Sequence, residues 1–306
     1  MKLFLTLRGG GFGVAGLHRW CRSTGNLSPP GYWIQPVLLR RLVRGRVSSA
    51  DSERVVQAVA ERYGHETPET RFLDADNWLS TPLVIDEELF VKVISDQNTL
   101  IHALFTTGRN LGAFSSGTAG FFESFQTPVE MAHHELEATQ EMQALGLHTP
   151  VPKEAFEVDG YGVVVFEYLP EFRPLDDLDP DTERHLADEL FAALATLHDA
   201  GLAHGDLRAE NVLIRDEDLY FIDATSVNSE ARAAIRSYDL ACGLAALEPV
   251  LGARETVAAA LSSYSADDLL EAADFLDFVS IRPDHDFEAA GLKSEIEKTA
   301  TDSQPV

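Results

Sequence analysis

The sequence predicts an α+β fold in which a small antiparallel sheet precedes a mainly helical region. Three short runs rich in β-branched and aromatic residues, at 70–73, 82–85 and 89–94, are separated by polar turns, which indicates consecutive antiparallel strands. Two later segments, residues 127–145 and 179–201, carry apolar residues at helical spacing. Because the strands come before the long helices, we expect two structural parts with separate cores.

Composition excludes several kinds of protein. The chain has 306 residues, of which 50 are acidic and 24 basic, giving a formal net charge of -26. Such a surface repels nucleic acid and anionic membranes, so we expect neither as a partner. Only five of the basic residues are Lys, a balance that resembles proteins of salt-accumulating halophiles. A hydrophobic fraction of 45% argues against disorder.

Nothing in the sequence indicates a disulfide scaffold or a membrane span. Cys21 and Cys242 are too few for a cysteine-rich framework or zinc site. The apolar start of the chain ends early at Arg8 and the glycines that follow, which is too short for a signal peptide. No uninterrupted apolar run is long enough to cross a bilayer. We therefore expect a cytoplasmic protein.

Residues 1–50 differ from the rest of the chain, because they contain eight Lys and Arg and no acidic residue. This N-terminal extension is either a basic arm or upstream sequence included through a wrongly assigned start. We favour the second, since residues 9–36 show no periodic pattern. A glycine motif at residues 11–16 has the letters of a nucleotide-binding loop, but no acidic residue follows about twenty positions later, so we do not expect phosphate binding there.

A single Lys marks the third predicted strand. A short amphipathic helix at residues 51–63 comes before the three strands. Lys92 is the only Lys between Lys2 and Lys153, and its strand neighbours are apolar. A lone cation in such a strand is costly unless it is paired, so a carboxylate and a ligand phosphate are its natural partners. The alternative is an edge-strand Lys that faces solvent.

The helix predicted at residues 127–145 has clear start and stop signals. Thr127 is a good cap, Pro128 suits the first turn, and Gly146 ends the pattern. Before it, residues 95–126 form an insertion rich in Gly, Phe, Ser and Thr. A loop of that length is usually functional or mobile.

A second hairpin carries the most informative polar residues. The acidic turn at residues 216–218 predicts a three-residue loop, which pairs Arg215 with Leu219 and places Asn211 opposite Asp223. An amide oxygen and a carboxylate so placed can share a hard cation such as Mg²⁺. Asp206 lies in the loop just before the hairpin and is free to accept a proton from an attacking hydroxyl.

This pattern resembles the catalytic loop and metal-binding aspartate of the protein-kinase-like superfamily. Asp206 lies five residues before Asn211, and Asp223 follows the hairpin, as in that superfamily. The loop begins His204-Gly205, as in its atypical members: RIO-type and related small kinases, and aminoglycoside and lipopolysaccharide-core sugar kinases. The resemblance implies a two-lobed fold, with an N-lobe at residues 51–168 and a C-lobe at 169–306.

The resemblance also implies roles for single residues and two cofactors, ATP and Mg²⁺. Lys92 would hold the α- and β-phosphates of ATP, and Glu135 on the helix would orient Lys92, with Glu137 and Glu141 as rival carboxylates. Mg²⁺ would lie between Asn211 and Asp223. Asp206 would orient and deprotonate the hydroxyl of a protein or small-molecule acceptor.

The nucleotide base and phosphates have their own expected contacts. Residues 161–169 resemble the strand that leads into the hinge between the lobes, so backbone groups of Glu167 and Leu169 would bond the adenine. The turn after the first strand has no glycine, unlike the family. Phosphate contacts there would come from backbone amides and from the hydroxyls of Ser80 and Thr81.

The second half departs from typical protein kinases. Ala224 and Thr225 stand where Phe-Gly is usual, and Asp239 follows too soon for a long activation segment. We expect a helix opening at Asp179 to present the catalytic loop, and a polar, frayed tail from Ala290. An atypical, RIO-like serine/threonine protein kinase is the first interpretation. The alternatives are a small-molecule or sugar kinase, and a nucleotide-binding pseudokinase that acts as a scaffold.

Overall fold

The computed structural model of the chain describes residues 47–73, 80–99, 125–224, 232–282 and 285–302. All of them belong to one unit, Leu42–Val306. The predictions for the N-terminal extension, for the glycine motif and for most of the insertion lie outside the described residues.

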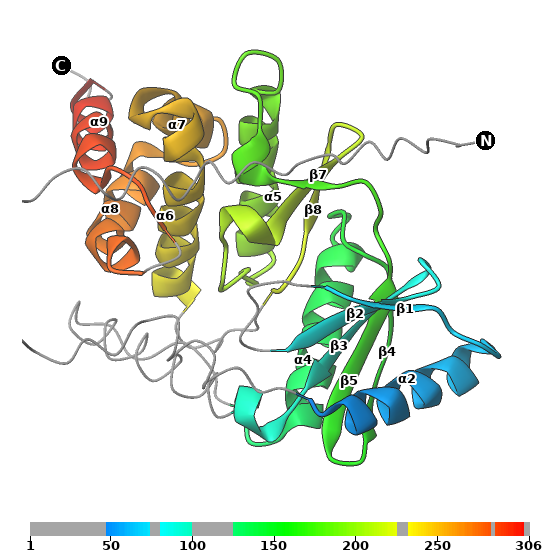
Figure 1. The fold of residues 1–306 in the computed structure, drawn as a ribbon. Coiled ribbons are helices and arrows are strands. Elements are labelled where there is room, and N and C mark those ends of the chain that lie inside the picture. The colour runs from blue at the N-terminus through cyan, green and yellow to red at the C-terminus, as the bar shows by residue number, and fades with distance from the viewer. Residues whose placement is uncertain (1–46, 74–79, 100–124, 225–231, 283–284, 303–306) are drawn as a thin grey trace, which may run out of the picture. The chain divides into compact units, whose positions relative to one another are not determined.

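An antiparallel sheet of five strands forms the first half of this unit, in the order β1-β2-β3-β5-β4 (Figure 1). The three strands expected at residues 70–94 are present, and each pairs with its sequence neighbour. β4 was not predicted; charged residues such as Lys153 and Glu154 alternate along it and hide its apolar side. The strands are β1 (Thr70–Phe72), β2 (Thr81–Ile85), β3 (Leu89–Ile94), β4 (Pro152–Val158) and β5 (Tyr161–Glu167).

Two helices cover the sheet. On one face, Val55 and Val59 of α2 (Ser49–Tyr63) belong to a buried cluster with Val91 of β3. On the other face, Met131 of α4 (Pro128–Ala144) belongs to a cluster with Phe166 of β5. These helices and the five strands are called the small lobe below (Figure 1).

Helix α4 starts where predicted and is fixed at that end. Thr127 caps it, and its side chain accepts a hydrogen bond from the Glu130 N–H at 3.2 Å. The first turn touches β5, because a Cβ placed on Gly162 would lie 2.0 Å from the Pro128 carbonyl oxygen. Only glycine therefore allows strand and helix to approach this closely.

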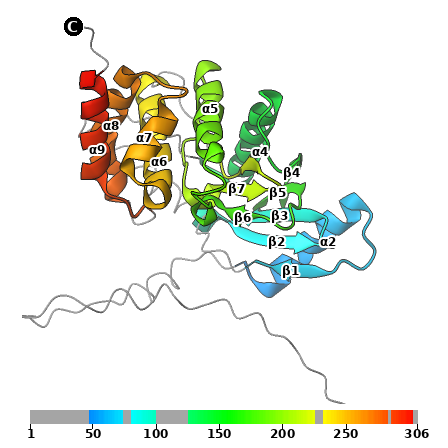
Figure 2. The same ribbon diagram turned by 90° about the horizontal axis from the view of Figure 1, so that it is seen from above.

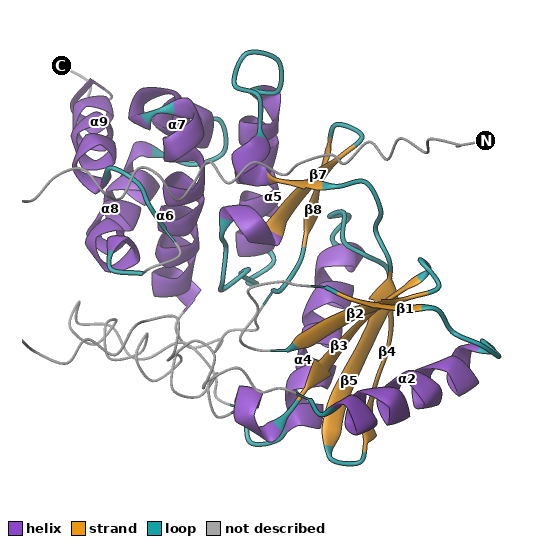
Figure 3. Cartoon of the chain, viewed as in Figure 1, coloured by secondary structure: helices purple, strands orange, loops and turns teal. Residues whose placement is uncertain are grey.

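The rest of the unit, called the large lobe below, is mainly helical, and its helices gather beside the short hairpin (Figures 2 and 3). Its core includes Leu190 and Leu194 of α5 and Leu244 and Leu247 of α6, all fully buried. Its elements are β6 (Arg173–Pro174), η2 (Leu175–Asp177), α5 (His185–Asp199), η3 (Ala209–Asn211), β7 (Val212–Arg215), β8 (Asp218–Phe221), α6 (Arg232–Leu251), α7 (Ala253–Ala260), α8 (Ala266–Ser280) and α9 (Ala289–Asp302).

The predicted register of the β7–β8 hairpin is wrong by one residue. Arg215 pairs with Asp218 rather than Leu219, so the loop has two residues. Asp216 and Glu217 both have positive φ, at 51° and 73°, as a tight type I′ turn requires. That turn follows the twist of the strands better than a longer loop, and tertiary packing here outweighs the low preference of both residues for this conformation.

The corrected register moves the two predicted metal ligands relative to each other. The Ile222 N–H donates to the Asn211 carbonyl oxygen at 3.0 Å, so Ile222 rather than Asp223 lies opposite Asn211. Asp223 follows with φ of 59°.

Two helix predictions also need correction. α5 begins at His185, not at Asp179, because the Asp179 side chain accepts from the Asp181 N–H and the Thr182 hydroxyl and closes a separate turn. The tail is not frayed: α9 buries Leu292 and Ile296, one helical turn apart, which the polar residues around them concealed.

These elements confirm the predicted α+β, two-lobed protein-kinase-like architecture. Among the residues that the structure describes, no helix has both the length and the apolar character needed to cross a membrane.

Candidate active site

Lys92 stands at the centre of a buried ion cluster. Strand alternation places it on the α4 face of the sheet, next to Phe90 and opposite Val164. Its ammonium contacts the carboxylates of Glu135 on α4 and of Asp223 just after β8. Three separate elements thus meet at one cation.

The charges in this cluster depend on each other. Burial opposes the charged form of Lys92, but the attraction of Asp223 and Glu135 outweighs it, so the pKa of Lys92 is raised. Burial also raises the pKa of Glu135, an effect that the Lys92 charge only partly offsets. The rival carboxylates Glu137 and Glu141 are exposed. Of the three, Glu135 is the one that contacts Lys92.

Asp239 on α6 holds the backbone of the expected catalytic loop at His204 and Gly205. The backbone N–H groups of His204 and Gly205 donate to its two carboxylate oxygens at 2.6 and 2.9 Å. Asp239 is fully buried, and Gly205 has φ of 78°. The Tyr264 hydroxyl is bonded to His198 Nδ1 at 2.7 Å, and His198 Nε2 lies 3.4 Å from Asp239. The loop conformation is therefore fixed by buried polar groups of three helices or their ends.

The His204 side chain links this loop to the end of the β7–β8 hairpin. Its Nε2 lies 3.0 Å from the Ile222 carbonyl oxygen, and because a carbonyl only accepts, Nε2 carries the proton. Burial lowers the pKa of His204, although the charges of Asp239, Asp206 and Asp223 act in the opposite direction. A neutral ring that donates to a backbone carbonyl suits a role in holding the loop.

Asp206 is not free in this structure, contrary to the expectation from the sequence. Its Oδ1 accepts a hydrogen bond from Arg282 Nη2 at 2.9 Å, and Arg208 Nε lies 3.4 Å from its Oδ2. Arg282 comes from the end of α8, 76 residues along the chain. Sequence reasoning missed Arg282, because nothing in its local pattern marks it.

Asn211 and Asp223 supply oxygen donors of the kind that Mg²⁺ prefers. The Asn211 amide nitrogen donates to the Asp206 carbonyl at 2.8 Å, which orients the amide, and its oxygen has only a long contact of 3.4 Å with Arg208. Within the described residues, no group of three or more His, Cys, Asp or Glu side chains is placed to hold a metal. The donor set therefore fits a cation whose remaining ligands are water and nucleotide phosphate.

Ser80 and Thr81, whose hydroxyls were expected to contact phosphate, lie on opposite faces of the sheet. Ser80 directly precedes β2, and strand alternation places it on the face of Pro82, which pairs with Lys92. Ser80 is buried, and its hydroxyl has no hydrogen-bond partner in the part of the chain that the structure describes. Thr81 lies on the opposite face, the one that α2 covers. Ser80 is therefore the better placed of the two, and the rest of its turn lies outside the described residues.

The residues expected to contact the adenine lie at the end of β5 and directly after it. The Glu167 N–H donates to the Val151 carbonyl at 2.9 Å, so this N–H is already engaged within the protein. Phe166 is buried, and its ring centroid lies 6.0 Å from Lys92 Nζ. Leu169 follows β5 and lines the cavity described next.

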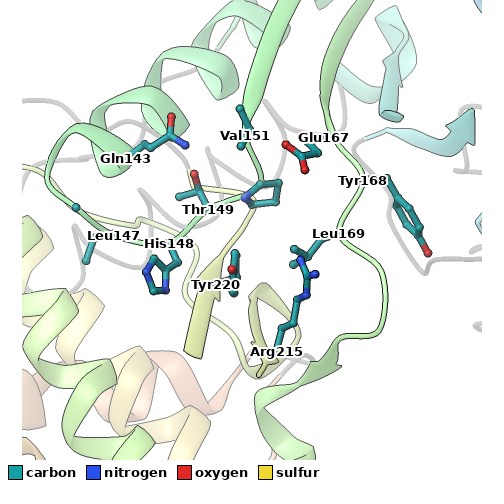
Figure 4. A pocket seen from close by; sticks show the side chains of 12 residues that line it. Gln143, Leu147, His148, Thr149, Val151, Glu167, Tyr168, Leu169, Arg215 and Tyr220 are labelled. Carbon is teal, nitrogen blue, oxygen red and sulfur yellow. The ribbon is translucent and has the colours of Figure 1, made fainter. Parts of the chain in front are cut away.

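A cavity of about 340 Å³ lies behind the hinge (Figure 4). Glu167 and Leu169 line it together with Arg215 and Tyr220 of the hairpin, and Lys92, Asp206 and Asp223 are not among its lining residues. At this place the Phe221 N–H of β8 donates to the His148 carbonyl at 2.9 Å, which ties the loop after α4 to the large lobe. The cavity is thus separate from the ion cluster.

Most of the residues at the centre of this site lie in a segment that matches a known protein family. The pattern of the RIO domain family matches residues 123–237, which include Glu135, Asp206, Asn211 and Asp223. The expected resemblance to atypical, RIO-type kinases is confirmed over this segment. Lys92 lies before the matched segment, and the ion cluster joins it to that segment.

Two curated proteins match shorter segments of this chain. One is a probable bifunctional tRNA threonylcarbamoyladenosine biosynthesis protein of Methanothermobacter thermautotrophicus, 41% identical over 78 residues. The other is the KEOPS complex subunit Bud32 of Pyrococcus abyssi, 35% identical over 72 residues. The matches cover 26% and 22% of this chain, and 14% and 33% of the relatives' own lengths.

Among solved structures, the chain is similar to the Rio2 kinase of Chaetomium thermophilum in a complex with ADP, Mg²⁺ and phosphoaspartate. The TM-score is 0.44 at 14% identity, and the alignment covers 81% of this chain and 75% of the other.

Proposed function

We propose that this chain is an ATP-dependent phosphotransferase that moves the terminal phosphoryl group of ATP to an acceptor hydroxyl. The observation that carries the proposal is the ion cluster of Lys92, Glu135 and Asp223, which lies beside the loop that carries Asp206. Phosphoryl transfer depends mainly on positioning and on charge stabilisation. A buried cation with a fixed carboxylate partner suits that requirement.

Each residue then has one task. Glu135 keeps Lys92 in place while the ammonium exchanges Asp223 for phosphate oxygens. Asp206 accepts a hydrogen bond from the acceptor hydroxyl and directs its oxygen at the phosphorus. Asn211 and Asp223 would hold Mg²⁺, which when bound neutralises charge on the phosphates. The acceptor that we favour is a Ser or Thr hydroxyl of a protein, as in a RIO-like kinase.

A second candidate role follows from the names of the two curated relatives. One belongs to the KEOPS complex and the other to tRNA threonylcarbamoyladenosine biosynthesis. In that role the chain would spend ATP inside an assembly that modifies tRNA, rather than on a free acceptor. Nucleotide turnover that depends on such an assembly would favour this role.

Labelled ATP tests the proposal. The purified chain is incubated in high salt with Mg²⁺, with a general protein acceptor or a set of sugars, and transfer of label is measured. Asp206→Asn should reduce transfer at least about 100-fold. Glu135→Gln should reduce it strongly, while Glu137→Gln, on the exposed side of α4, should not. Transfer that survives Asp206→Asn contradicts the proposal, and nucleotide binding without any turnover indicates a pseudokinase.

A further inference from the structure

The contact between Arg282 and Asp206 links the end of α8 to the catalytic loop. Arg282 Nη2 donates to Asp206 Oδ1 at 2.9 Å, and the side chains are only 9% and 6% exposed. The other end of the guanidinium contacts the hydroxyl of Tyr238. Arg282 lies two residues beyond the end of α8, directly after the C-cap Ile281.

Tyr238 gives this contact a rigid support. It is fully buried on α6, and its ring packs against Phe275 and Phe278 of α8, with ring centroids 6.3 and 6.0 Å away. The next residue, Asp239, holds the catalytic loop by its backbone. One turn of α6 therefore fixes both the loop backbone, through Asp239, and the side chain of Asp206, through Tyr238 and Arg282.

Stability alone gives a poor reason for the pair. Moving two charges out of water costs several kcal/mol each, and apolar replacements of buried ion pairs are often neutral or stabilising. Arg also loses more side-chain entropy on ordering than most residues. The pair does, however, restrict the carboxylate to one orientation, which is what a group that must aim a hydroxyl needs.

We propose that Arg282 is a positioning residue for Asp206, which makes the C-terminal end of α8 a part of the catalytic machinery. This inference rests on the proposed phosphotransfer. Arg282 holds Oδ1 and so sets the direction of the carboxylate. Arg208, which approaches Oδ2 at 3.4 Å and also contacts Glu210, has the weaker geometry for this task.

A double-mutant cycle tests the coupling. Arg282→Met keeps an unbranched, flexible stem and removes the guanidinium with its charge, and we expect kcat to fall about 10- to 100-fold with little change in KM for ATP. Arg282→Lys should recover part of the loss. In the Asp206→Asn background, Arg282→Met should have no further effect on kcat, because Arg282 acts through Asp206. An equal loss in both backgrounds overturns the proposal.

The matched control is Arg184→Met. Arg184 pairs with Glu255 in the same lobe, and within the described residues no hydrogen bond or ion pair joins it to the loop that carries Asp206. The substitution Arg184→Met removes an Arg from an ion pair without changing a contact of Asp206, and kcat should remain within about twofold of the wild type. A loss equal to that of Arg282→Met would mean that the effect is a general one on the fold of the large lobe.

Hydrogen exchange separates this inference from the proposed function. Amides of the catalytic loop at residues 205–208 should exchange faster in Arg282→Met than in the wild type or Arg184→Met, while those of α5 should not change. Unchanged exchange in the loop overturns the positioning role even if the enzyme turns over. If the loop exchanges faster in Arg282→Met but the wild type shows no phosphotransfer, Arg282 remains a positioning residue for Asp206 and the proposed reaction is rejected.

Discussion

Lys92 and Asp223 form a direct ion pair, so the predicted phosphate-binding cation is held by the predicted metal-binding carboxylate. In the proposed reaction, a nucleotide phosphate and Asp223 would compete for the same ammonium. A metal ion on Asp223 would release Lys92 at the moment when the phosphates arrive. The two halves of the proposed Mg-ATP site are therefore coupled through one contact.

Asp223→Asn should tighten the binding of ATP in the absence of Mg²⁺, because Lys92 loses its competitor. We expect the Kd to fall about tenfold, or ~1.4 kcal/mol. Titration calorimetry with and without a chelator measures the change. Asp218→Asn, on the exposed part of the same hairpin, is the matched control. An unchanged Kd without metal would mean that the ion pair does not oppose nucleotide binding.

Lys92→Met should destabilise the small lobe, because Glu135 would stay buried without a cation. Breaking a buried pair by removing one partner costs about 3–5 kcal/mol. Urea unfolding measures the loss. Lys92→Met combined with Glu135→Gln should recover part of it, since the uncompensated charge is gone; no recovery would place the cost in packing instead.

His204 should make the folded state sensitive to mild acid. Burial lowers its pKa below the ordinary 6.5, so below pH 6.5 the unfolded chain takes up a proton that folded His204 resists. The free energy of unfolding therefore falls as the pH drops through this window, by at most about 1.4 kcal/mol per pH unit, and is unaffected above it. His204→Gln should reduce this slope and His133→Gln, at an exposed position, should not. Equal slopes in all three proteins would exclude His204 as the cause.

Gly162→Ala should shift α4, since the added Cβ would lie 2.0 Å from the Pro128 carbonyl oxygen. We expect a loss of about 1–3 kcal/mol in unfolding free energy, as for other overpacked sites. Thermal unfolding measures it. Gly291→Ala in α9 meets only ordinary contacts of 3.6 Å and should be neutral or stabilising, because Ala favours the helix. A neutral Gly162→Ala would show that strand and helix can separate at little cost.

Glu217→Gly should stabilise the hairpin. Glu217 has φ of 73°, which glycine adopts without strain and other residues at about 1 kcal/mol. An increase of that size in unfolding free energy would agree with the two-residue turn. A three-residue loop in solution, as the sequence suggested, predicts no such gain.

Much of the fold follows from local pattern. The strands around Lys92 and the helix capped by Thr127 have periodic apolar residues and clear turn or cap signals, so they appear where expected. The hairpin register does not follow, because Asp216-Glu217 has no sequence signature of a type I′ turn. The buried side of α9 was missed because it rests on only two apolar residues in a polar segment.

The residues of the site likewise divide into those that the sequence indicates and those that only the packing brings together. Asp206, Asn211 and Asp223 stand at spacings that a sequence can show, and Lys92 is marked by its isolation. The contact of Asp206 with Arg282 joins residues 76 apart through the packing of α8 on α6, and no local pattern contains that information. Whether Ser80, Thr81, Glu167 and Leu169 bind nucleotide stays a prediction.

The bond between Phe221 and His148 has a mechanical consequence. It joins the lobes at the rear, beside the place where the chain itself passes from Glu167 into the large lobe. With two tethers on one side, a change in the separation of the lobes becomes a rotation about that side. The cavity of Figure 4 lies beside both tethers, so a rotation of the lobes about that side would change its width.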